Sequence, residues 1–516
     1  MIKKGTVLLA VLIFAVSALY SQESPAENYD DDDTLYVISD FEFEIKGRSR
    51  PDAIIRSIEL KKGEQIRGRA NLDRYVRDKT QMLINQRILK DNAEISYDIG
   101  EESADGSFPV VLLIKAEDSW NIIALPRPKY STNTGFELVI KARDYNFFGT
   151  MIPLRIDLGY FYNENHKNSF SFEVDSSLPF RAFGYDWNFS FINLFEYRPE
   201  VDEPFFFKNI TGLSMELPFR NTTFTFGFEE SLNLNEENSS RQQLATGEEF
   251  QTGVYMSTKL YTSWKIPTGL EVFQFGELTY TPEIAAIFNH KINSPLQDIR
   301  QGPFLRFQHS LGFEKIDWHA NFRKGLSVFA DNSFTYDFFR LDNDVDPISI
   351  TFSVNGTGHY IVSDFFAVSS RLMYRHWFYH DPPFHDQAAD AIRGIADKAI
   401  AADYMLSLNT DFPFRVLLFM PSEWFNNRKL RFFDFELQIS PVIDFSLYHN
   451  PEKPSFSSEN FTASGGLEFI AFPFFMRNLF IRLGFAYNLR EFFTARPLKL
   501  PSGENYEIVF TLGHHY

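Results

Sequence analysis

Apolar and polar residues alternate along most of the chain from residue 119 onward. A period of two places every second side chain on the same face, which is typical of β-strands whose two faces meet different surroundings. The closing stretch Tyr506–Tyr516 shows the pattern clearly, with Ile508 and Phe510 on one face and Glu507 on the other. Residues 119–516 are therefore predicted to consist almost entirely of strands.

The alternating runs are about ten residues long or slightly longer, and polar turns separate them, as in bacterial outer-membrane barrels. A final strand that runs to the chain end is consistent with a closed barrel, because lipid tolerates no open sheet edge. We therefore predict a transmembrane β-barrel of about sixteen antiparallel strands over residues 119–516. The clearest strands before the longest loop are 136–146, 151–163, 169–174, 185–195, 221–234, 254–264, 305–313, 325–338, 348–362 and 366–379.

The N-terminus has the features of a secretory signal peptide over residues 1–21. Lys3 and Lys4 precede the apolar stretch Thr6–Val16, and small residues follow it. The alternative is an uncleaved anchor helix, which is disfavoured because the stretch is shorter than the roughly 20 residues that a membrane span requires. Residues 22–34 are acidic and polar, and we expect a disordered linker there.

A separate α+β domain is predicted between the linker and the barrel, over residues 35–118. Residues 36–47 alternate as a strand, and a helix capped at Ser49 follows it. A second helix begins at Asn71, and residues 88–99 and 108–116 form two more strands. The order is strand, helix, helix, strand, strand.

The composition narrows the classes of function. The 516 residues include 68 acidic and 50 basic residues, and the net charge of −18 argues against a nucleic-acid partner. The sequence has no Cys, which excludes disulfides, thiolate metal sites and a lipid-bearing cysteine. No nucleophile elbow, phosphate loop or zinc-protease helix is present, so we expect neither an enzyme nor a cofactor.

Three histidines precede the longest loop or lie within it: His376, His380 and His385. At strand spacing His376 and His380 share a face, so an adventitious surface site for a metal is one interpretation. The wet rim of a barrel is the favoured one. No metal site is therefore expected.

The motif Ile392-Arg393-Gly394-Ile395 follows a long polar loop. A guanidinium is always charged and offers donors in one plane, so Arg393 can fix a loop tip to a carboxylate inside a lumen. Gly394 allows the backbone to turn close to the wall. The alternative is that Arg393 is an ordinary solvated loop residue. Five predicted strands follow the motif, at 403–412, 432–448, 461–472, 479–489 and 507–516.

The element order of residues 35–118 resembles a POTRA domain, the periplasmic module of BamA-type outer-membrane proteins. The motif around Arg393 resembles the Val/Ile-Arg-Gly-aromatic signature in the sixth extracellular loop of that superfamily, where five strands also follow. The resemblance implies that Ile392, Arg393 and Gly394 lock this loop inside the barrel. It implies Asp444 as the partner of Arg393, and it places Asn409 where a Glu is usual.

The two ends of the predicted barrel extend the resemblance. Gly135–Gly149 resembles the first barrel strand of the superfamily with its turn, and the closing stretch resembles its C-terminal pattern. This implies a weakly paired lateral seam between strands 136–146 and 507–516. The implied seam residues are Gly135, Asn146, Gly149, Phe510, Leu512, Gly513 and Tyr516.

The resemblance implies insertion and folding of other outer-membrane proteins, or polypeptide export, with a seam edge that templates a client strand. The implied location is the bacterial outer membrane, with residues 35–118 in the periplasm. The implied partners are outer-membrane lipids, unfolded outer-membrane clients, and periplasmic chaperones or assembly lipoproteins at residues 35–118, through the strand 88–99. The alternatives are a generic α+β spacer for that domain, and a passive porin-like channel or a two-partner secretion transporter for the whole chain.

Overall fold

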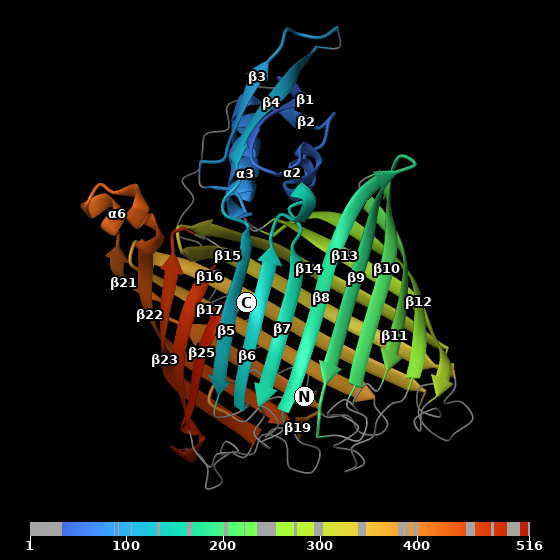
Figure 1. Ribbon diagram of the computed structural model, residues 1–516. Helices are drawn as coiled ribbons and strands as arrows, with labels where there is room; N and C mark the ends of the chain where they lie inside the picture. The colour runs from blue at the N-terminus through green and yellow to red at the C-terminus, as the bar shows by residue number, and fades with distance from the viewer. Residues whose placement is uncertain are drawn as a thin grey trace.

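The chain forms a large β-barrel with a small α+β domain at one end (Figure 1). The computed structural model describes residues 34–86, 88–90, 92–104, 106–131, 135–162, 168–200, 205–220, 222–234, 254–272, 276–293, 303–338, 347–379, 386–387, 392–395, 401–449, 460–475, 479–492 and 506–513. The predicted signal peptide and all but the last residue of the acidic linker lie outside these residues. None of the helices in the described ranges reaches the length and hydropathy of a membrane-spanning helix.

The N-terminal domain is a four-stranded sheet with two helices. Its elements are β1 (Leu35–Lys46), α2 (Pro51–Ser57), β2 (Gln65–Arg67), α3 (Arg69–Asn85), β3 (Glu94–Ile99) and β4 (Ser107–Glu117). The strand order is β2-β1-β4-β3, with β1 parallel to β4. A core that includes Ile38, Ile54, Leu72 and Leu112 joins the helices to one face of the sheet.

The order of these elements follows the prediction, with β2 as an addition. This strand has only three residues and pairs with the start of β1, so its alternation was too short to recognise. The predicted helix cap at Ser49 is wrong, because the N-cap is Arg50 and makes no side-chain hydrogen bond. The hydroxyl of Ser49 donates instead to Asp118 (2.6 Å).

The barrel consists of antiparallel strands that close on themselves. Their bounds are β5 (Ile122–Ser131), β6 (Gly135–Asp144), β7 (Leu154–Tyr162), β8 (Asn168–Ala182), β9 (Tyr185–Tyr197), β10 (Phe205–Phe219), β11 (Thr222–Leu234), β12 (Val254–Glu271), β13 (Glu277–Asn293), β14 (Phe304–His319), β15 (Phe322–Asp337), β16 (Ile348–Ser363), β17 (Phe366–Tyr379), β20 (Tyr404–Asp411), β21 (Phe414–Phe419), β22 (Phe435–His449), β23 (Phe461–Pro473), β24 (Phe480–Asn488) and β25 (Tyr506–Gly513). The shorter elements outside the wall are η1 (Phe147–Gly149), β18 (Asp386–Gln387), β19 (Ala401–Ala402), α6 (Pro421–Trp424), η4 (Arg428–Phe433) and η6 (Leu489–Phe492).

The barrel prediction is confirmed, and the strand number is close to the sixteen expected. The described residues contribute nineteen strand segments to the wall, of which β20 and β21 both pair with β17 and β22. These two are halves of one strand that is interrupted at Pro413, so the barrel has eighteen strand positions.

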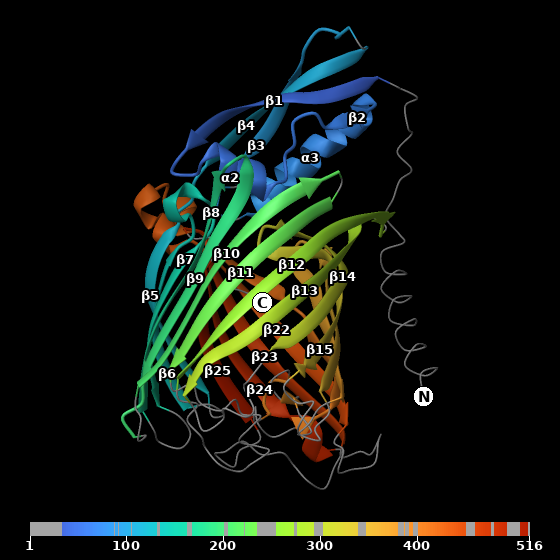
Figure 2. The ribbon, with the colours of Figure 1, turned by 90° about the vertical axis from the view of Figure 1, so that its right-hand side faces the viewer.

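The strands are apolar outside and polar inside, the reverse of a soluble protein. On β22 the outward side chains Ile443, Phe445 and Leu447 are exposed, while Asp444 and Ser446 between them are buried. An outward band of this kind faces lipid in membrane barrels, and the polar residues line the lumen. Figure 2 shows the N-terminal domain lying across one end of the barrel, with α2 and α3 on the side that faces the barrel.

Candidate functional site

The loop tip 392–395 lies inside the barrel wall. Ile392 and Ile395 are buried in a cluster with Met373, Met405 and Tyr448. Gly394 has a φ of +77°, and a Cβ at this position would lie 3.0 Å from the carbonyl oxygen of Ala486. Glycine is therefore required where the loop turns against β24.

Arg393 forms a two-pronged contact with Asp444, the partner that the sequence implied. Its Nε donates to Oδ2 (2.8 Å) and its Nη2 to Oδ1 (2.6 Å) of Asp444. The backbone N–H of Arg393 also donates to Oδ2 (3.1 Å). Asp444 is only 1% exposed, so the pair is shielded from water. Bidentate pairs of this kind fix orientation as well as charge.

Two further carboxylates complete the site around Arg393, and sequence reasoning missed both. Nη1 donates to Oε1 of Glu468 on β23 (3.0 Å), and Nη2 lies 2.9 Å from Oδ1 of Asp411 on β20. A second guanidinium, from Arg482, lies 3.2 Å from the other oxygen of Glu468. Two guanidiniums therefore balance most of the charge of three acids that adjacent strands direct to the lumen.

Asn409 lies directly opposite Asp444 in the register of β20 and β22. The carboxylate that β20 gives to Arg393 comes from Asp411, two residues further along the same face. The sequence signal that could have identified Asp411 and Glu468 is that each is an acid at an inward position of a strand next to β22, which carries Asp444. The sequence match pointed to Asn409 and missed Asp411.

The lock also reaches the last strand of the barrel. The backbone N–H of Gly394 donates to Oε2 of Glu507 on β25 (2.8 Å). From the neighbouring strand β5, the Nε of Arg127 donates to the hydroxyl of Thr511 on β25 (2.9 Å). The loop tip, β25 and β5 are thus connected through named side chains across the place where the barrel closes.

The β5 side of the seam between β25 and β5 lacks two backbone hydrogen-bond donors. The N–H of Tyr145 donates to the carbonyl of Asn121 (2.8 Å), in register with the pairing of β5 and β6. Backbone groups of successive residues point alternately to opposite neighbours, so the odd-numbered residues of β5 point to β6 and the even-numbered ones to β25. Pro126 and Pro128 are even-numbered, and neither has an N–H. Both missing donors are therefore on the seam side.

The predicted seam between strands 136–146 and 507–516 is wrong, because β5 lies between β6 and β25. Gly135 pairs with Ser131 of β5 and lies one strand from the seam. The reason for the error is that the two prolines of β5 concealed a strand. Of the predicted seam residues, Phe510, Leu512 and Gly513 lie on β25, Tyr516 lies outside the described residues, and Asn146 and Gly149 belong to a different site.

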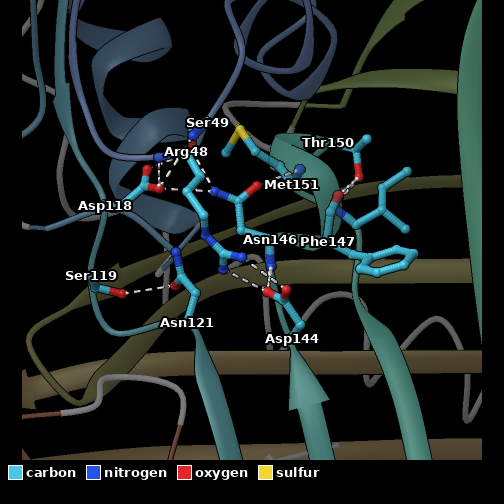
Figure 3. A network of polar contacts seen from close by, with 11 residues as sticks. Arg48, Ser49, Asp118, Ser119, Asn121, Asp144, Asn146, Phe147, Thr150 and Met151 are labelled. Atoms are coloured by element: carbon cyan, nitrogen blue, oxygen red, sulfur yellow. Dashed lines mark hydrogen bonds and ion pairs between the residues drawn. The ribbon is translucent and has the colours of Figure 1, made fainter.

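That different site is the junction between the N-terminal domain and the barrel (Figure 3). Asp118, just after β4, accepts hydrogen bonds from the N–H of Arg48 (2.7 Å) and of Ser49 (3.2 Å). It also accepts from Nδ2 of Asn146 (3.0 Å), which is fully buried. The guanidinium of Arg48 donates hydrogen bonds to both carboxylate oxygens of Asp144 at the end of β6 (2.8 and 3.0 Å). These hydrogen bonds raise the pKa of Arg48.

The turn after β6 is shaped to receive the domain. Asn146 accepts a hydrogen bond from the N–H of Met151 (2.9 Å), which closes the turn. The carbonyl of Gly149 accepts from the N–H of Arg50 (3.0 Å) at the start of α2. Gly149 has a φ of +76°, and a Cβ there would overlap the carbonyl oxygen of Arg48. Asn146 and Gly149 therefore join the two domains.

A second contact holds the far end of the domain. Asn85 at the end of α3 donates to Oδ1 of Asp317 (3.0 Å) and accepts from the N–H of Trp318 (3.1 Å). These partners lie near the end of β14. The turns after β6 and after β14 thus hold the domain at two places on the rim, and this fixes it across the mouth of the barrel (Figure 2).

Comparisons with known proteins found similar solved structures. No protein-family model and no curated protein sequence matches the chain. The chain is similar to CdiB from Acinetobacter baumannii, with 10% identity, a TM-score of 0.47, and coverage of 93% of this chain and 74% of that one.

Two more similar structures have lower TM-scores. BamA from Haemophilus ducreyi lacking POTRA domains 1–3 gives 11% identity, 93% and 84% coverage and a TM-score of 0.40. CdiB from Escherichia coli gives 9% identity, 99% and 97% coverage and a TM-score of 0.41. The fold is established by the strand pairing of the chain itself.

Proposed function

We propose that the chain is an outer-membrane protein of the BamA-type superfamily that helps other β-barrel proteins to fold into the membrane. The client would leave sideways through the seam between β25 and β5. No covalent bond is made or broken in this process. The barrel supplies a strand edge, and a client strand adds to that edge by backbone hydrogen bonds.

The observation that carries this proposal is the position of Pro126 and Pro128. Two prolines on the seam side of β5 offer no N–H groups to β25, so this junction should open at lower cost than a fully paired one. A barrel that acted only as a pore would gain nothing from a weak junction in its wall. The same feature favours insertion over export through the lumen.

The lock at Arg393 suits a seam that opens and closes. Asp444 and Glu468 hold the loop tip on β22 and β23, which lie next to β24 and β25. Gly394 then reaches Glu507 on β25. The loop tip would therefore keep β25 aligned with the rest of the wall while β5 separates from it.

A covalent bridge across the seam tests the proposal. The chain has no native Cys, so Arg127→Cys with Thr511→Cys gives one reactive pair, which a short thiol-reactive linker can join. Leu483→Cys with Phe510→Cys is the matched control, because these residues face each other in the fully paired junction of β24 and β25. Client folding into vesicles is then measured for both.

Bridging the seam pair should stop client folding, while bridging the control pair should leave it unchanged. Equal client folding by the two bridged proteins would refute a lateral exit. A block of polypeptide passage into the vesicle, with no effect on client folding into its membrane, would indicate export instead.

A further inference from the structure

The connection between β21 and β22 is much larger than a turn requires. Strands β8 and β9 are joined by Phe183 and Gly184 alone, whereas β21 and β22 are separated by residues 420–434, which contain α6 and η4. We refer to residues 420–434 as the foot. Figure 1 shows α6 at the outside of the barrel, at the end that carries the N-terminal domain.

The foot has an ordered internal structure. Oδ1 of Asp434 accepts from the N–H of Ser422 (3.0 Å), and the hydroxyl of Ser422 donates to the same carboxylate. The side chain of Asn427 accepts from the N–H of Lys429 (3.0 Å) at the start of η4. The ring of Phe432 stacks on Phe475 beyond β23, with centroids 4.4 Å apart. The segment is therefore held against the rim.

This fixed segment presents large apolar side chains outward. Trp424 is 59% exposed and Phe425 is 71% exposed, and Phe432 and Phe433 are more than half exposed. A water-soluble surface does not hold four such side chains in the open without a partner. The foot continues β21, on which the apolar side chains of Val416, Leu417 and Leu418 are also exposed.

The foot is also positively charged in an acidic chain. Arg428, Lys429 and Arg431 are exposed, whereas the whole chain carries a net charge of −18. Within residues 420–434, all of which the structure describes, Glu423 is the one exposed acid, and the carboxylate of Asp434 is buried. Aromatic rings beside Lys and Arg are typical of segments that lie in the headgroup layer of a membrane.

We propose that the foot binds anionic phospholipid headgroups in the leaflet next to the N-terminal domain. The aromatic rings would enter the boundary between headgroups and acyl chains, and the three cations would recruit negative lipids to it. Trp120, just before β5, is exposed and lies near Phe475 (centroids 6.1 Å apart). The lipid surface would thus extend from the foot to the edge of the seam. The inference requires the barrel to lie in a bilayer, as proposed above.

Fluorescence quenching of Trp424 tests this binding. The full chain is reconstituted into phosphatidylethanolamine vesicles that contain brominated phosphatidylglycerol or, at equal mole fraction, brominated phosphatidylcholine. Subtracting the signal of Trp424→Phe isolates the contribution of Trp424. We expect quenching by the anionic lipid to be about twofold stronger or more, because each Lys or Arg at a surface attracts anionic lipid.

A charge-neutral variant, Arg428→Gln with Lys429→Gln and Arg431→Gln, should lose this preference. The control removes three exposed cations at the same rim, Arg181 on β8, Arg220 after β10 and Lys265 on β12, and should keep the preference. Equal quenching by both lipids in the unaltered chain would overturn the proposal and would favour an acidic protein as the partner of the foot. A preference for the anionic lipid that survives in the charge-neutral variant would also overturn it, because the three cations would then not be its cause. Barrel insertion is read separately, from the gel mobility of unheated protein, so a failure to enter the vesicles counts against the proposed function instead.

Discussion

Replacing Arg393 with Ala tests whether the loop tip stabilises the barrel. The change removes two of the three hydrogen bonds to Asp444, one to Glu468 and the ion pair with Asp411. The bond from the backbone N–H of residue 393 can form in any variant, so two of the three bonds to Asp444 depend on the guanidinium. What remains is a group of acids with one guanidinium, that of Arg482, beside it.

The magnitude follows from the burial of the acids. Asp444 is 1% exposed and Glu468 is 3% exposed, and removing one partner of a buried ion pair costs about 3–5 kcal/mol. Arg393→Lys keeps the charge but cannot bridge both oxygens of Asp444 in one plane, so we expect a loss of about 1–3 kcal/mol. Arg155→Ala is the control, because Arg155 is half-exposed in its ion pair with Asp175 (3.5 Å), and such pairs contribute about 0–1 kcal/mol.

The assay is the midpoint temperature at which the folded barrel loses its fast mobility in a detergent gel. The expected order of midpoints is Arg393→Ala lowest, then Arg393→Lys, then Arg155→Ala near the unaltered chain. A midpoint for Arg393→Ala equal to that of Arg155→Ala would refute the view that the loop tip stabilises the wall.

Three further changes test the seam and the junction. Pro126→Ala with Pro128→Ala supplies two donors to β25, each worth about 0.5–1.5 kcal/mol, so client folding should slow and the gel midpoint should rise; an unchanged rate contradicts the role of the prolines. Glu507→Ala frees β25 from the loop tip, so a Cys placed at Ala124 should react faster with a water-soluble thiol reagent, and an equal rate would show that the contact does not restrain the seam. Asp118→Ala leaves the amide of Asn146 and two backbone N–H groups short of an acceptor, at a cost of about 1–3 kcal/mol. The change should broaden the spin-label distances between the N-terminal domain and the barrel, whereas Asp98→Ala on exposed β3 should not, and equal distributions would show that Asp118 does not hold the junction.

The period-two pattern predicted the barrel because each long strand has one face toward the outside and one toward the lumen. This difference acts on every strand, whichever strands lie beside it. The same reasoning failed for β5. Pro126 and Pro128 normally argue against a strand inside a sheet, yet this strand tolerates them at the seam. Pro126 and Pro128 therefore explain both why the sequence pattern did not predict this strand and why we propose that it opens.

The lock was partly predictable for a similar reason. The resemblance of the motif around Arg393 implied an acid inside the barrel, and it implied that this acid is Asp444. Asp411 and Glu468 depend on strand register, which sequence alone does not supply. Asn146 and Gly149 were recognised as special but assigned to the wrong site, because the sequence shows a tight turn and does not show that α2 packs against it.

The most direct test of the account captures a client at the seam. A photoreactive phenylalanine analogue is placed at Ala124 on β5, at Phe510 on β25, and as a control at the lipid-exposed Phe228 on β11. Light is applied while an unfolded β-barrel client is entering the vesicles. A lateral exit predicts client adducts at Ala124 and Phe510 and none at Phe228. Adducts at all three positions, or at none while the client folds at its normal rate, would contradict it.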